Sequence, residues 1–589
     1  MTAALDKAEA ALRAGKISEA RSVLEEALAG SLPQADRAEA LSMLGMARLA
    51  AGNAAEALDP LEQAVLLEPD EGMFRYNLAM GLERSGRIGQ ALEHHREAVR
   101  LSGGMPQLVV ALVRALIRAG GFAEAAERIA PIAGAANAPL PVRRLHVEAL
   151  RGTGDLHAAW TAVQRLIPSD LAQATPAERN VALLAARIAS DAQYLDEAES
   201  ISRALVRSDV ADGDAATVLA PLVLWSRGPE AASEIIENAL DQGAATPELL
   251  VQLLGFGKDV RGGVLSDAEA LAADERVHPY HRSQLLMALA QWHERQGDAE
   301  AAWNHASRGN ALAPKGPKRD WRKILGLQVD MFLNTAPTDG EPLHPKHLYL
   351  CGAPRSGQSL VQSIMAASPE VASLGERGAL LPHLLDKTEN LSAMAVEERQ
   401  TLFRQLSAAD RKGIARSVGA CDWVVDKNPA QIVVAGSIAR IHPSARFAVN
   451  LRDPADIATS IFLRGFSPFY DYATDLDAIV DHLELIVDAA AAWREAGLGI
   501  KAFSHEKLVA GAGEEAAALY RWLGIAWDES YLDPESRKTP VPTFSAAQVR
   551  EPIRPGISRG SAPYAEHLAP FEIQLNRIRE KQRLLLSRT

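Results

Sequence analysis

The C-terminal half of the sequence twice places an arginine directly after an apolar run. Arg355 lies in the loop APRSGQS, which follows the run HLYLCG, and Arg452 follows the run FAVNL. Ser460 comes eight residues after Arg452. A guanidinium forms paired hydrogen bonds with a phosphate dianion, and a nearby hydroxyl can complete such a site. The sequence therefore predicts two separate anion sites, one after each apolar run.

Each apolar run is predicted to be a buried strand that leads through a loop into a helix. LVQSIMAAS, after the first loop, has helical apolar spacing, and Asp453-Pro454 begins a helix after the second run. Such a loop directs backbone N–H groups and the positive end of the helix dipole at one point, which suits a phosphate. Gly352 and Gly357 have the spacing of a Walker A motif. Gln358 stands where that motif has lysine, which disfavours a nucleoside triphosphatase.

Each arginine taken alone has a simpler explanation. The segment PRSG could be an incidental turn, and Arg452 could form a salt bridge with Asp453 or Asp456. The occurrence of both segments in one chain favours the two anion sites.

The segment Pro354-Arg355-Ser356-Gly357, followed by a hydroxyl residue, resembles the 5′-phosphosulfate loop of sulfotransferases that use 3′-phosphoadenosine-5′-phosphosulfate (PAPS). Arg452 and Ser460 match the 3′-phosphate site of that family, RDPxDxxxS, residue for residue. Two separated anion sites distinguish PAPS from ATP or NAD. The resemblance implies that PAPS is the donor, that PAP is the product, and that the nucleotide is bound by Arg355, Ser356, Gly357, Gln358, Ser359, Leu360, Arg452, Ser460 and Tyr564.

The resemblance extends over most of residues 346–570. DKNPAQIVVAGSIARIHPSAR, FSHEKLV and PTFSAAQVREPI are similar, in order and approximate spacing, to bacterial tetratricopeptide-repeat sulfotransferases and more distantly to tyrosylprotein sulfotransferases. The family usually has two hydroxyl residues after the loop glycine, whereas this chain has Gln358 and then Ser359. It also reads GISRGSAPYAEHL where relatives commonly have Gly-Arg-Trp and a tyrosine that cover the nucleotide. Tyr564 remains, and Arg559 is a candidate substitute.

The resemblance also implies three roles in the transfer of a sulfuryl group to an acceptor hydroxyl. Arg355 would stabilise the bridging oxygen as it leaves, and Glu376 in SLGERGAL would take the acceptor proton. Lys427 in the DKNP segment would place a second cation near the transferred group. The alternatives are that Glu376 is only a charge at a helix start and that Lys427 forms a surface ion pair with Asp426.

Composition limits the class of protein. With 589 residues and a net charge of −13, the chain is too long for one core and too acidic for a general nucleic-acid binder. Its two cysteines are too few for a disulfide framework, and Cys351 is expected to be a buried thiol. Neither a secretory signal nor a membrane span is recognised, so we expect a soluble, cytoplasmic protein. We expect no metal requirement, because the adjacent His94 and His95 point in different directions on a helix and should be solvated.

Before residue 334 the sequence repeats with a period of 34 residues. The period is carried by Gly52, Gly86, Gly120 and Gly154 and by Ala57, Ala91, Ala125 and Ala159. Glycine permits a tight turn between two helices, and alanine lets their backbones approach. The pattern resembles the tetratricopeptide repeat, and Gly297 with Ala302 marks a later unit. Residues 206–280 are predicted to be helical, without a repeat count.

These patterns predict an all-α helical repeat domain at 1–333, a linker at 334–345 and an α/β sulfotransferase domain with a mainly parallel sheet at 346–589. The concave face of the array could hold a protein or peptide acceptor. The array could equally serve dimerisation, which would make the protein a homodimer, or shield the catalytic domain.

We therefore expect a sulfotransferase that moves a sulfuryl group from PAPS to a hydroxyl of a peptide tyrosine or a glycan. One alternative is a repeat scaffold whose C-terminal domain binds nucleotide without catalysis, which Gln358 and the absent Gly-Arg-Trp motivate. Another, less favoured, is a P-loop kinase that depends on Mg-ATP. The sequence does not identify the acceptor.

Overall fold

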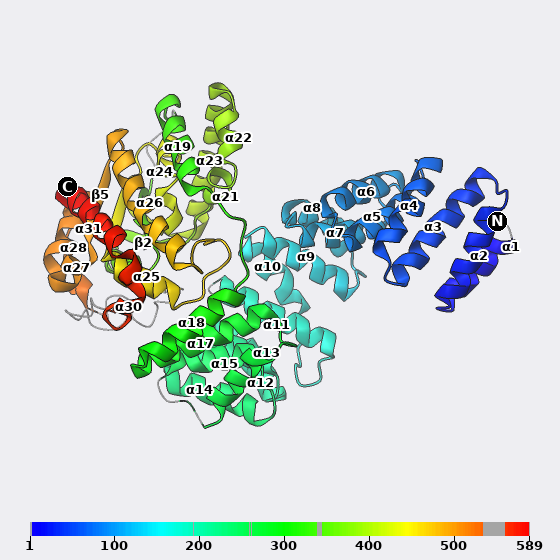
Figure 1. Ribbon diagram of the computed structural model, residues 1–589, viewed down its shortest axis with the longest axis horizontal. Helices are drawn as coiled ribbons and strands as arrows, with labels where there is room; N and C mark the ends of the chain where they lie inside the picture. Colours follow the sequence, from blue (N-terminus) through cyan, green and yellow to red (C-terminus); the bar gives the residue numbers. More distant parts are fainter. Residues whose placement is uncertain are drawn as a thin grey trace. The chain divides into compact units, whose positions relative to one another are not determined.

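The structure is a computed structural model that describes residues 3–192, 194–257, 260, 262–338, 344–533 and 560–587. The chain divides into two compact units, Met1–Leu249 and Leu250–Thr589. Within the described residues the first unit contains helices and no strand, whereas the second contains a sheet (Figure 1). In the parts of the chain that the structure describes, no helix is both long and apolar enough to cross a membrane.

The first unit is a succession of helices, each packed against the next along the chain. Its helices are α1 (Ala3–Arg13), α2 (Ile17–Ala29), α3 (Gln34–Ala50), α4 (Ala54–Leu67), α5 (Gly72–Arg84), α6 (Ile88–Leu101), α7 (Pro106–Arg118), α8 (Phe122–Ala133), α9 (Leu140–Gly152), α10 (Leu156–Val163), α11 (Pro176–Asp191), α12 (Leu195–Ser208), α13 (Gly213–Arg227) and α14 (Pro229–Asp241). Helix α15 (Pro247–Phe256) spans the boundary between the units. Because each helix contacts its neighbours in sequence, this unit has the packing of a repeat array.

The repeating small residues do what the sequence predicts. Gly52 and Gly86 lie in the turns between paired helices with φ of 86° and 76°, a backbone conformation that favours glycine. Ala57 and Ala91 are fully buried, so no larger side chain separates the helices there. The prediction that residues 206–280 are helical is confirmed by α12 to α15 and by α16 (Val264–Ala273).

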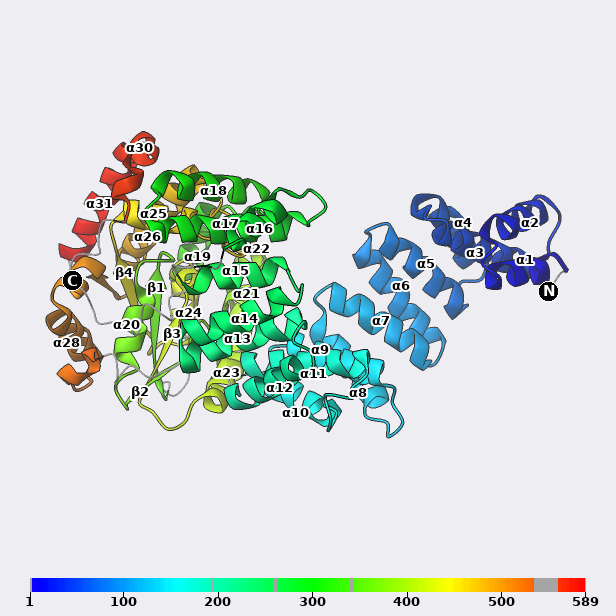
Figure 2. The same ribbon diagram turned by 90° about the horizontal axis from the view of Figure 1, so that it is seen from below.

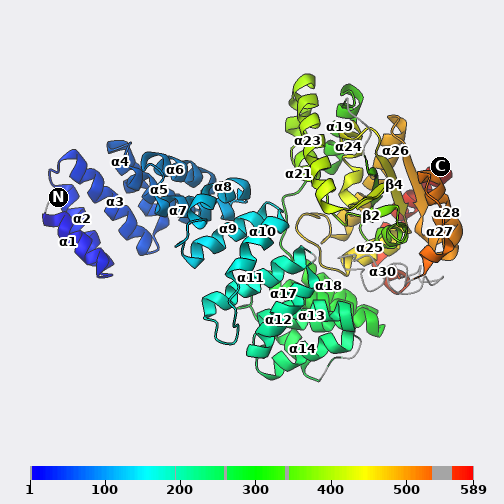
Figure 3. The ribbon, with the colours of Figure 1, turned by 180° about the vertical axis from the view of Figure 1, so that it is seen from behind.

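The second unit begins with helices and continues into an α/β domain, which can be followed in Figures 2 and 3. Its further helices are α17 (Pro279–Gln296), α18 (Ala299–Leu312), α19 (Trp321–Asn334), α20 (Gln358–Met365), α21 (Leu381–Leu384), α22 (Thr388–Ala393), α23 (Val396–Ser417), α24 (Ala435–Ile441), α25 (Pro454–Phe462), α26 (Leu476–Glu495), α27 (His505–Ala510), α28 (Ala512–Leu523), α30 (Ala565–Leu568) and α31 (Glu572–Ser587). The strands are β1 (Lys346–Gly352), β2 (Val371–Ser373), β3 (Trp423–Lys427), β4 (Arg446–Leu451) and β5 (Ile500–Ser504).

The sheet has the strand order β2-β3-β1-β4-β5, and every paired strand is parallel. Successive residues of a strand point to opposite faces, so each face builds its own core. Leu348 and Leu350 pack with α20 and α28, whereas Tyr349 and Cys351 pack with α19, α24, α25 and α26. This three-layer arrangement confirms the predicted α/β domain with a mainly parallel sheet. It also buries the Cys351 thiol, as predicted, and burial raises its pKa.

Helices α17, α18 and α19 share a hydrophobic core with the sheet. Trp321 and Phe332 of α19 belong to that core, and Asn310 of α18 donates a hydrogen bond to the Phe462 carbonyl at 2.9 Å. The compact unit that holds the sheet therefore begins at Leu250. The domain boundary predicted at 334–345 stays a prediction, and residues 339–343 within it lie outside the described residues.

Candidate active site

Strands β1, β4 and β5 end at one edge of the sheet, because all are parallel. The loop with Arg355 follows β1, the turn with Arg452 follows β4, and His505 follows β5. Strand order changes direction around β1, and in open parallel sheets ligands bind outside the carboxyl ends of strands at such a point. The two predicted anion sites therefore meet at the place where this fold binds ligands.

The loop after β1 has a backbone that ordinary residues rarely adopt. Gly352 has φ of 131°, and a Cβ there would lie 2.9 Å from the Asn450 carbonyl oxygen. Gly357, the N-cap of α20, has φ of 94°. Arg355 has φ of 67°, in the left-handed region that is strained for a residue other than glycine. Such strain is stored most often at ligand-binding loops, which is consistent with the predicted role of this segment.

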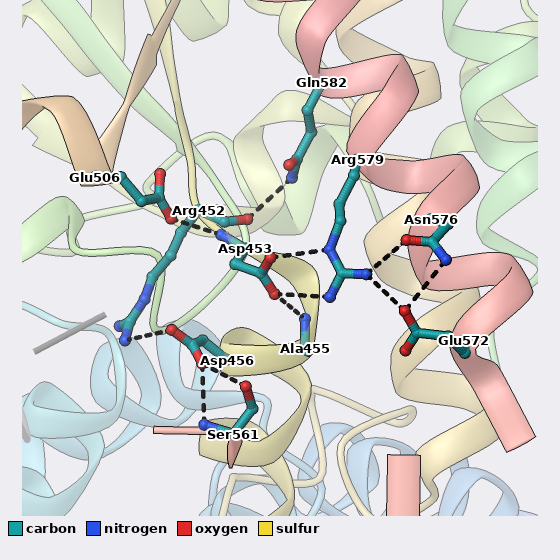
Figure 4. A network of polar contacts seen from close by, with 10 residues as sticks. All are labelled: Arg452, Asp453, Ala455, Asp456, Glu506, Ser561, Glu572, Asn576, Arg579 and Gln582. Atoms are coloured by element: carbon teal, nitrogen blue, oxygen red, sulfur yellow. Dashed lines mark hydrogen bonds and ion pairs between the residues drawn. The ribbon is translucent and has the colours of Figure 1, made fainter. Parts of the chain in front are cut away.

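The turn after β4 separates the side chains of Arg452 and Asp453 (Figure 4). The Asp453 carboxylate caps α25 by accepting from the Ala455 N–H at 2.9 Å, and its own N–H donates to Glu506 Oε1 at 2.8 Å. Arg452 lies on the other side, where its Nη2 is 3.5 Å from Asp456 Oδ2. Of the two salt bridges considered for Arg452, the described residues therefore show the one with Asp456 and not the one with Asp453.

The C-terminal helix α31 holds this turn in place (Figure 4). Arg579 Nε donates to Asp453 Oδ2 at 2.9 Å, and Gln582 Nε2 donates to the Arg452 carbonyl at 3.0 Å. A third contact comes from Ser561, whose Oγ donates to Asp456 Oδ1 at 2.7 Å. Sequence analysis did not identify these residues, because they lie more than a hundred residues from the turn and belong to no motif.

Two arginines contact Ser460, and a third contacts the backbone of one of them. Arg355 Nε donates to Ser460 Oγ at 3.1 Å, and Arg464 Nη1 donates to the same oxygen at 3.3 Å. Arg452 Nη1 donates to the Arg355 carbonyl at 3.2 Å, so the two predicted anion sites are joined directly. Burial, followed by the charges of Arg464 and Arg452, lowers the pKa of Arg355 to about 9. This concentration of positive charge in an acidic chain is what binding of a polyanion requires.

Several buried polar atoms of the site have no hydrogen-bond partner within the described residues. They are Ser356 Oγ, Arg452 Nε and His505 Nδ1. A buried polar atom without a partner is costly, and a bound anion with many acceptor oxygens would supply partners for the hydroxyl and the guanidinium. Burial and then the Arg452 charge lower the pKa of His505 to about 4, so its imidazole is neutral at neutral pH. Its ring also lies against Gly357, where a Cβ would come within 2.3 Å of Nδ1.

Glu376, Lys427 and Ser359 form a second group next to the loop. The Lys427 ammonium pairs with the Glu376 carboxylate and lies 3.4 Å from Ser359 Oγ. The Lys427 side chain is 4% exposed, whereas that of Glu376 is 44% exposed and can be reached from solvent. The structure thus brings together the predicted proton acceptor, the second cation and a hydroxyl of the nucleotide loop.

The simpler explanations of Glu376 and Lys427 are wrong. Glu376 lies outside the first turn of α21, which contains no acidic residue. Lys427 pairs with Glu376 and not with Asp426, because neighbouring residues of β3 point to opposite faces of the sheet. Asp426 is buried on its own face, where burial raises the pKa of its carboxyl to about 7 despite a hydrogen bond from Gln431.

A buried ion pair anchors the segment that carries Glu376. The adjacent Arg377 pairs with Asp410 of α23, and Asp410 Oδ2 lies 2.9 Å from His442 Nε2. Asp410 and His442 are both almost completely buried. Because a buried network holds its members in one arrangement, Arg377 fixes the position of the residue before it.

The remaining predicted nucleotide residues lie around the loop. Gln358 is buried, and its amide is 3.5 Å from the Leu350 carbonyl of β1. Leu360 is half-buried and packs beside the core that contains α20. Tyr564 is buried with its ring centre 5.6 Å from that of Trp303 in α18, and burial raises its pKa to about 12. Arg559 lies outside the described residues.

A helical hairpin also contributes to the site. Glu294 of α17 accepts from Arg464 Nη2 at 3.0 Å, and Arg464 contacts Ser460 through Nη1. Sequence analysis missed Arg464, although it lies only four residues after Ser460, just beyond the C-terminal end of α25. It also missed Glu294, His505 and Glu506 as site residues, and only the quoted segment FSHEKLV pointed to the last two.

Within the described residues, no three His, Cys, Asp or Glu side chains are arranged to hold a metal ion. The absence of a metal requirement stays a prediction. The expectation that His95 is solvated is wrong, because the side chain is 1% exposed and its Nε2 lies 3.0 Å from Glu83 Oε1. His95 shares a helix face with the buried Ala91 and Ala98, and that face packs inside the array.

Two parts of the chain match family models. Residues 347–529 match the sulfotransferase family, and residues 31–104 match the bacterial transcriptional activator domain. The first match contains both anion loops, Glu376 and Lys427. The second falls within the helical array.

Comparison with curated proteins finds similar sequences at low identity. An uncharacterized protein from Aquifex aeolicus is 23% identical over 329 residues, which are 51% of this chain and 42% of the relative. Protein-tyrosine sulfotransferase 2 from Gallus gallus is 23% identical over 199 residues, which are 32% of this chain and 53% of the relative. The chain thus spans about half the length of the curated relatives that it matches.

Solved structures of two kinds match the chain at low identity. The sulfotransferase domain of the Synechococcus olefin synthase covers 40% of this chain and 98% of its own length, with 16% identity and a TM-score of 0.24. A tetratricopeptide repeat protein from Parabacteroides merdae covers 42% of this chain and 96% of its own length, with 14% identity and a TM-score of 0.32.

Proposed function

We propose that the chain transfers a sulfuryl group from PAPS to a hydroxyl of a peptide tyrosine or a glycan. Residues 347–529 match the sulfotransferase family, and they follow a tetratricopeptide-like array. One observation carries the proposal. The two predicted anion loops meet, because Arg452 Nη1 donates to the Arg355 carbonyl and Arg355 Nε donates to Ser460 Oγ. A single phosphate would need one such loop, whereas a nucleotide with phosphates at both ends of its ribose would engage both.

The residues present fit PAPS. Ser356 Oγ and Arg452 Nε are buried without a partner in the described part of the chain, and both lie in the loops that would hold phosphate groups. The N-terminus of α20 directs its dipole at the same loop. When bound there, PAPS supplies the sulfuryl group on a phosphate leaving group. In this proposal Arg355, Ser356 and Gly357 hold the 5′ end, while Arg452 and Ser460 hold the 3′-phosphate.

The proposed reaction moves one sulfuryl group and one proton. The acceptor oxygen forms a bond to sulfur, the bond from sulfur to the bridging oxygen breaks, and PAP leaves with that oxygen. Glu376 takes the proton of the acceptor hydroxyl, and its exposed carboxylate is accessible to a bound acceptor. Arg355 stabilises the negative charge that develops on the bridging oxygen, and Lys427 offers a second cation.

The first test is nucleotide selectivity in the purified full-length protein. Isothermal titration should show much tighter binding of PAP than of 5′-AMP, because Arg452 and Ser460 make charge-assisted hydrogen bonds only to the 3′-phosphate. Each such bond contributes roughly 1.5–3 kcal/mol, so Arg452→Ala should weaken PAP binding about tenfold or more and leave AMP binding nearly unchanged. Equal affinity of the wild-type protein for PAP and AMP would refute the two-site assignment.

Label transfer then separates the competing functions. With radioactive PAPS and cell lysate, a sulfotransferase labels an acceptor, and a scaffold that binds nucleotide without catalysis does not. A P-loop kinase would instead transfer label from γ-labelled ATP and would require Mg²⁺. The proposal expects label from PAPS alone.

A further inference from the structure

A hollow of about 460 Å³ lies within the N-terminal unit. Its walls come from α7, α9 and α11, which are the first helices of three successive hairpins. The volume is within the range of pockets that hold ligands or anchoring side chains. Neither the nucleotide site nor the turn glycines of the repeat use this hollow, which we call the arginine pocket after the side chains on its rim.

The rim of the arginine pocket carries more positive than negative charge. Arg114, Arg118 and Arg144 line it together with the acidic Glu148. Arg144 Nε lies 2.9 Å from Glu148 Oε1, and Arg118 pairs with Glu83. Arg114 is exposed and has no ion pair within the described residues. Acidic residues outnumber basic ones in residues 1–249, so this basic rim is a local feature of an acidic unit.

The floor of the arginine pocket is apolar. Leu145 and Val181 line it and are 9% and 1% exposed, so they belong to the packed interior of the array. Asn180 stands at the rim with an exposed side chain, and no hydrogen bond of its amide is found in the described part of the chain. An amide both donates and accepts, so it can pair with a peptide backbone.

We propose that the arginine pocket binds an acidic stretch of a polypeptide. Carboxylates of that stretch pair with Arg114 and Arg144, an apolar side chain packs on Leu145 and Val181, and the backbone pairs with Asn180. The apolar floor favours a polypeptide over a free phosphate, which has no apolar part to bury. That this polypeptide is the sulfuryl acceptor rests on the proposed function, whereas the binding itself does not.

A peptide of defined composition tests the binding. The probe is a short fluorescein-labelled peptide in which glutamate alternates with leucine, and the comparison peptide has glutamine in place of glutamate. Fluorescence anisotropy with the full-length protein should show saturable binding of the glutamate peptide that weakens as salt is raised, because exposed charges are screened. The glutamine peptide should bind at least about tenfold more weakly.

Variants locate the binding site. Arg114→Ala combined with Asn180→Ala should weaken binding of the glutamate peptide at least about tenfold, and Arg114→Glu should weaken it further. Arg128→Ala is the matched control, because Arg128 is also exposed but belongs to α8 and does not line the arginine pocket. All substituted side chains are exposed, so circular dichroism should show unchanged helix content in every variant.

Three results would overturn the proposal. The double variant could bind the glutamate peptide as tightly as the Arg128→Ala control does, which would place the peptide elsewhere. Glutamine and glutamate peptides could bind equally, which would remove the role of charge. Inorganic phosphate could displace the peptide at equal concentration, which would make the hollow a site for small anions.

The two proposals fail separately, because this binding is measured without PAPS. Peptide binding that depends on Arg114, in a protein that transfers no label from PAPS, would refute the proposed function and leave the arginine pocket intact. Label transfer that is unchanged in Arg114→Glu, together with absent peptide binding, would refute the arginine pocket alone.

Discussion

Glu83 in the array and Glu294 in the sheet unit occupy the same position of the helical hairpin, three residues before the turn glycines Gly86 and Gly297. Glu83 accepts from His95 of the same hairpin and pairs with Arg118 of the next one. Glu294 instead holds Arg464, which contacts a predicted nucleotide residue. One repeat position therefore joins hairpins in the first unit and supports the candidate site in the second. A hairpin of this type is a scaffold whose use depends on what packs against it.

The largest effect is expected when helices α17 to α19 are removed from the unit that contains the sheet. The predicted linker at 334–345 implies that a cut within it leaves a C-terminal fragment that binds nucleotide. The packing of α17 to α19 leads us to expect the opposite, because a fragment 344–589 would expose Tyr472 and Trp493, whose rings now contact Trp321 and Phe332 of α19. Each large apolar side chain contributes roughly 1.5–3 kcal/mol when buried, and a domain has about 5–15 kcal/mol in total.

Thermal denaturation followed by circular dichroism measures this difference. A fragment 250–589 should unfold cooperatively and bind PAP, whereas 344–589 should show no cooperative transition. If both fragments unfold at the same temperature and bind PAP equally, α17 to α19 do not support the sheet.

A second substitution tests Glu376, the proposed base, separately from Glu294, which holds Arg464. Glu376→Gln keeps the shape of the side chain but cannot accept a proton, so turnover with PAPS should fall about 10²- to 10⁴-fold. Titration of PAP should give nearly the wild-type affinity, because Glu376 faces Lys427 and not the anion loops. Near-normal turnover of Glu376→Gln on the true acceptor would contradict its role as the base.

Arg355→Ala provides the contrasting variant. Its guanidinium faces the bound anion before and during the reaction, so turnover and PAP affinity should both fall. A loss of turnover alone would restrict Arg355 to the transition state.

A third test replaces each of the two equivalent glutamates, Glu294 and Glu83, with glutamine. Glu294→Gln removes the charge that holds Arg464, so PAP affinity should fall by up to about tenfold, in proportion to one hydrogen bond between charged groups. Glu83→Gln should leave PAP affinity unchanged and lower the thermal stability of the array, since His95 and Arg118 lose their partner. Equal effects of both substitutions on PAP affinity would show that the contact between Glu294 and Arg464 has no specific role in PAP binding.

A last comparison concerns how pH acts on the stability of the two units. Burial raises the pKa of the Glu83 carboxyl. The hydrogen bond from His95 and the charges of His95 and Arg118 outweigh burial, so the pKa of Glu83 lies below its usual 4.5. A lowered folded pKa gives stability that is present above pH 4.5 and is lost as pH falls through the folded value. Burial raises the pKa of Asp426 from 3.8 to about 7, so its contribution is lost as pH rises from about 4 through 7.

Isolated units make the two pH trends visible. The unfolding temperature of residues 1–249 should drop below pH 4.5, and that of 250–589 should decline between about pH 4 and 7. Asp426→Asn should flatten the second decline, since one pKa unit corresponds to about 1.4 kcal/mol. An unchanged decline in Asp426→Asn would assign it to another group.

Patterns within short segments of the sequence were sufficient to predict much of the fold. The 34-residue period predicts the hairpins because each turn needs a glycine with positive φ and each narrow contact needs an alanine. Strand, loop and helix around Arg355 and Arg452 follow from the apolar runs and from the start of a helix at Pro454. These features depend on residues that are close together in the chain, so a single sequence is enough to predict them.

The missed residues depend on contacts between distant segments. Arg579 and Gln582 reach the Arg452 turn from α31, and Glu294 reaches Arg464 from α17. None has a spacing or composition that distinguishes it from an exposed charge on a helix. The interpretation of Lys427 and Asp426 as a surface pair failed for a related reason, because the burial of β3 on both faces is a property of the assembled sheet.

The position of α31 has a consequence for the order in which the parts of a newly made chain fold. Each array hairpin contacts its neighbours in sequence, so it can fold while the ribosome is still translating the next one. The Arg452 turn is different, since Arg579 and Gln582 are synthesised well over a hundred residues after it. A nascent chain therefore displays a finished array, with its arginine pocket, long before the turn that carries Arg452 is held by α31.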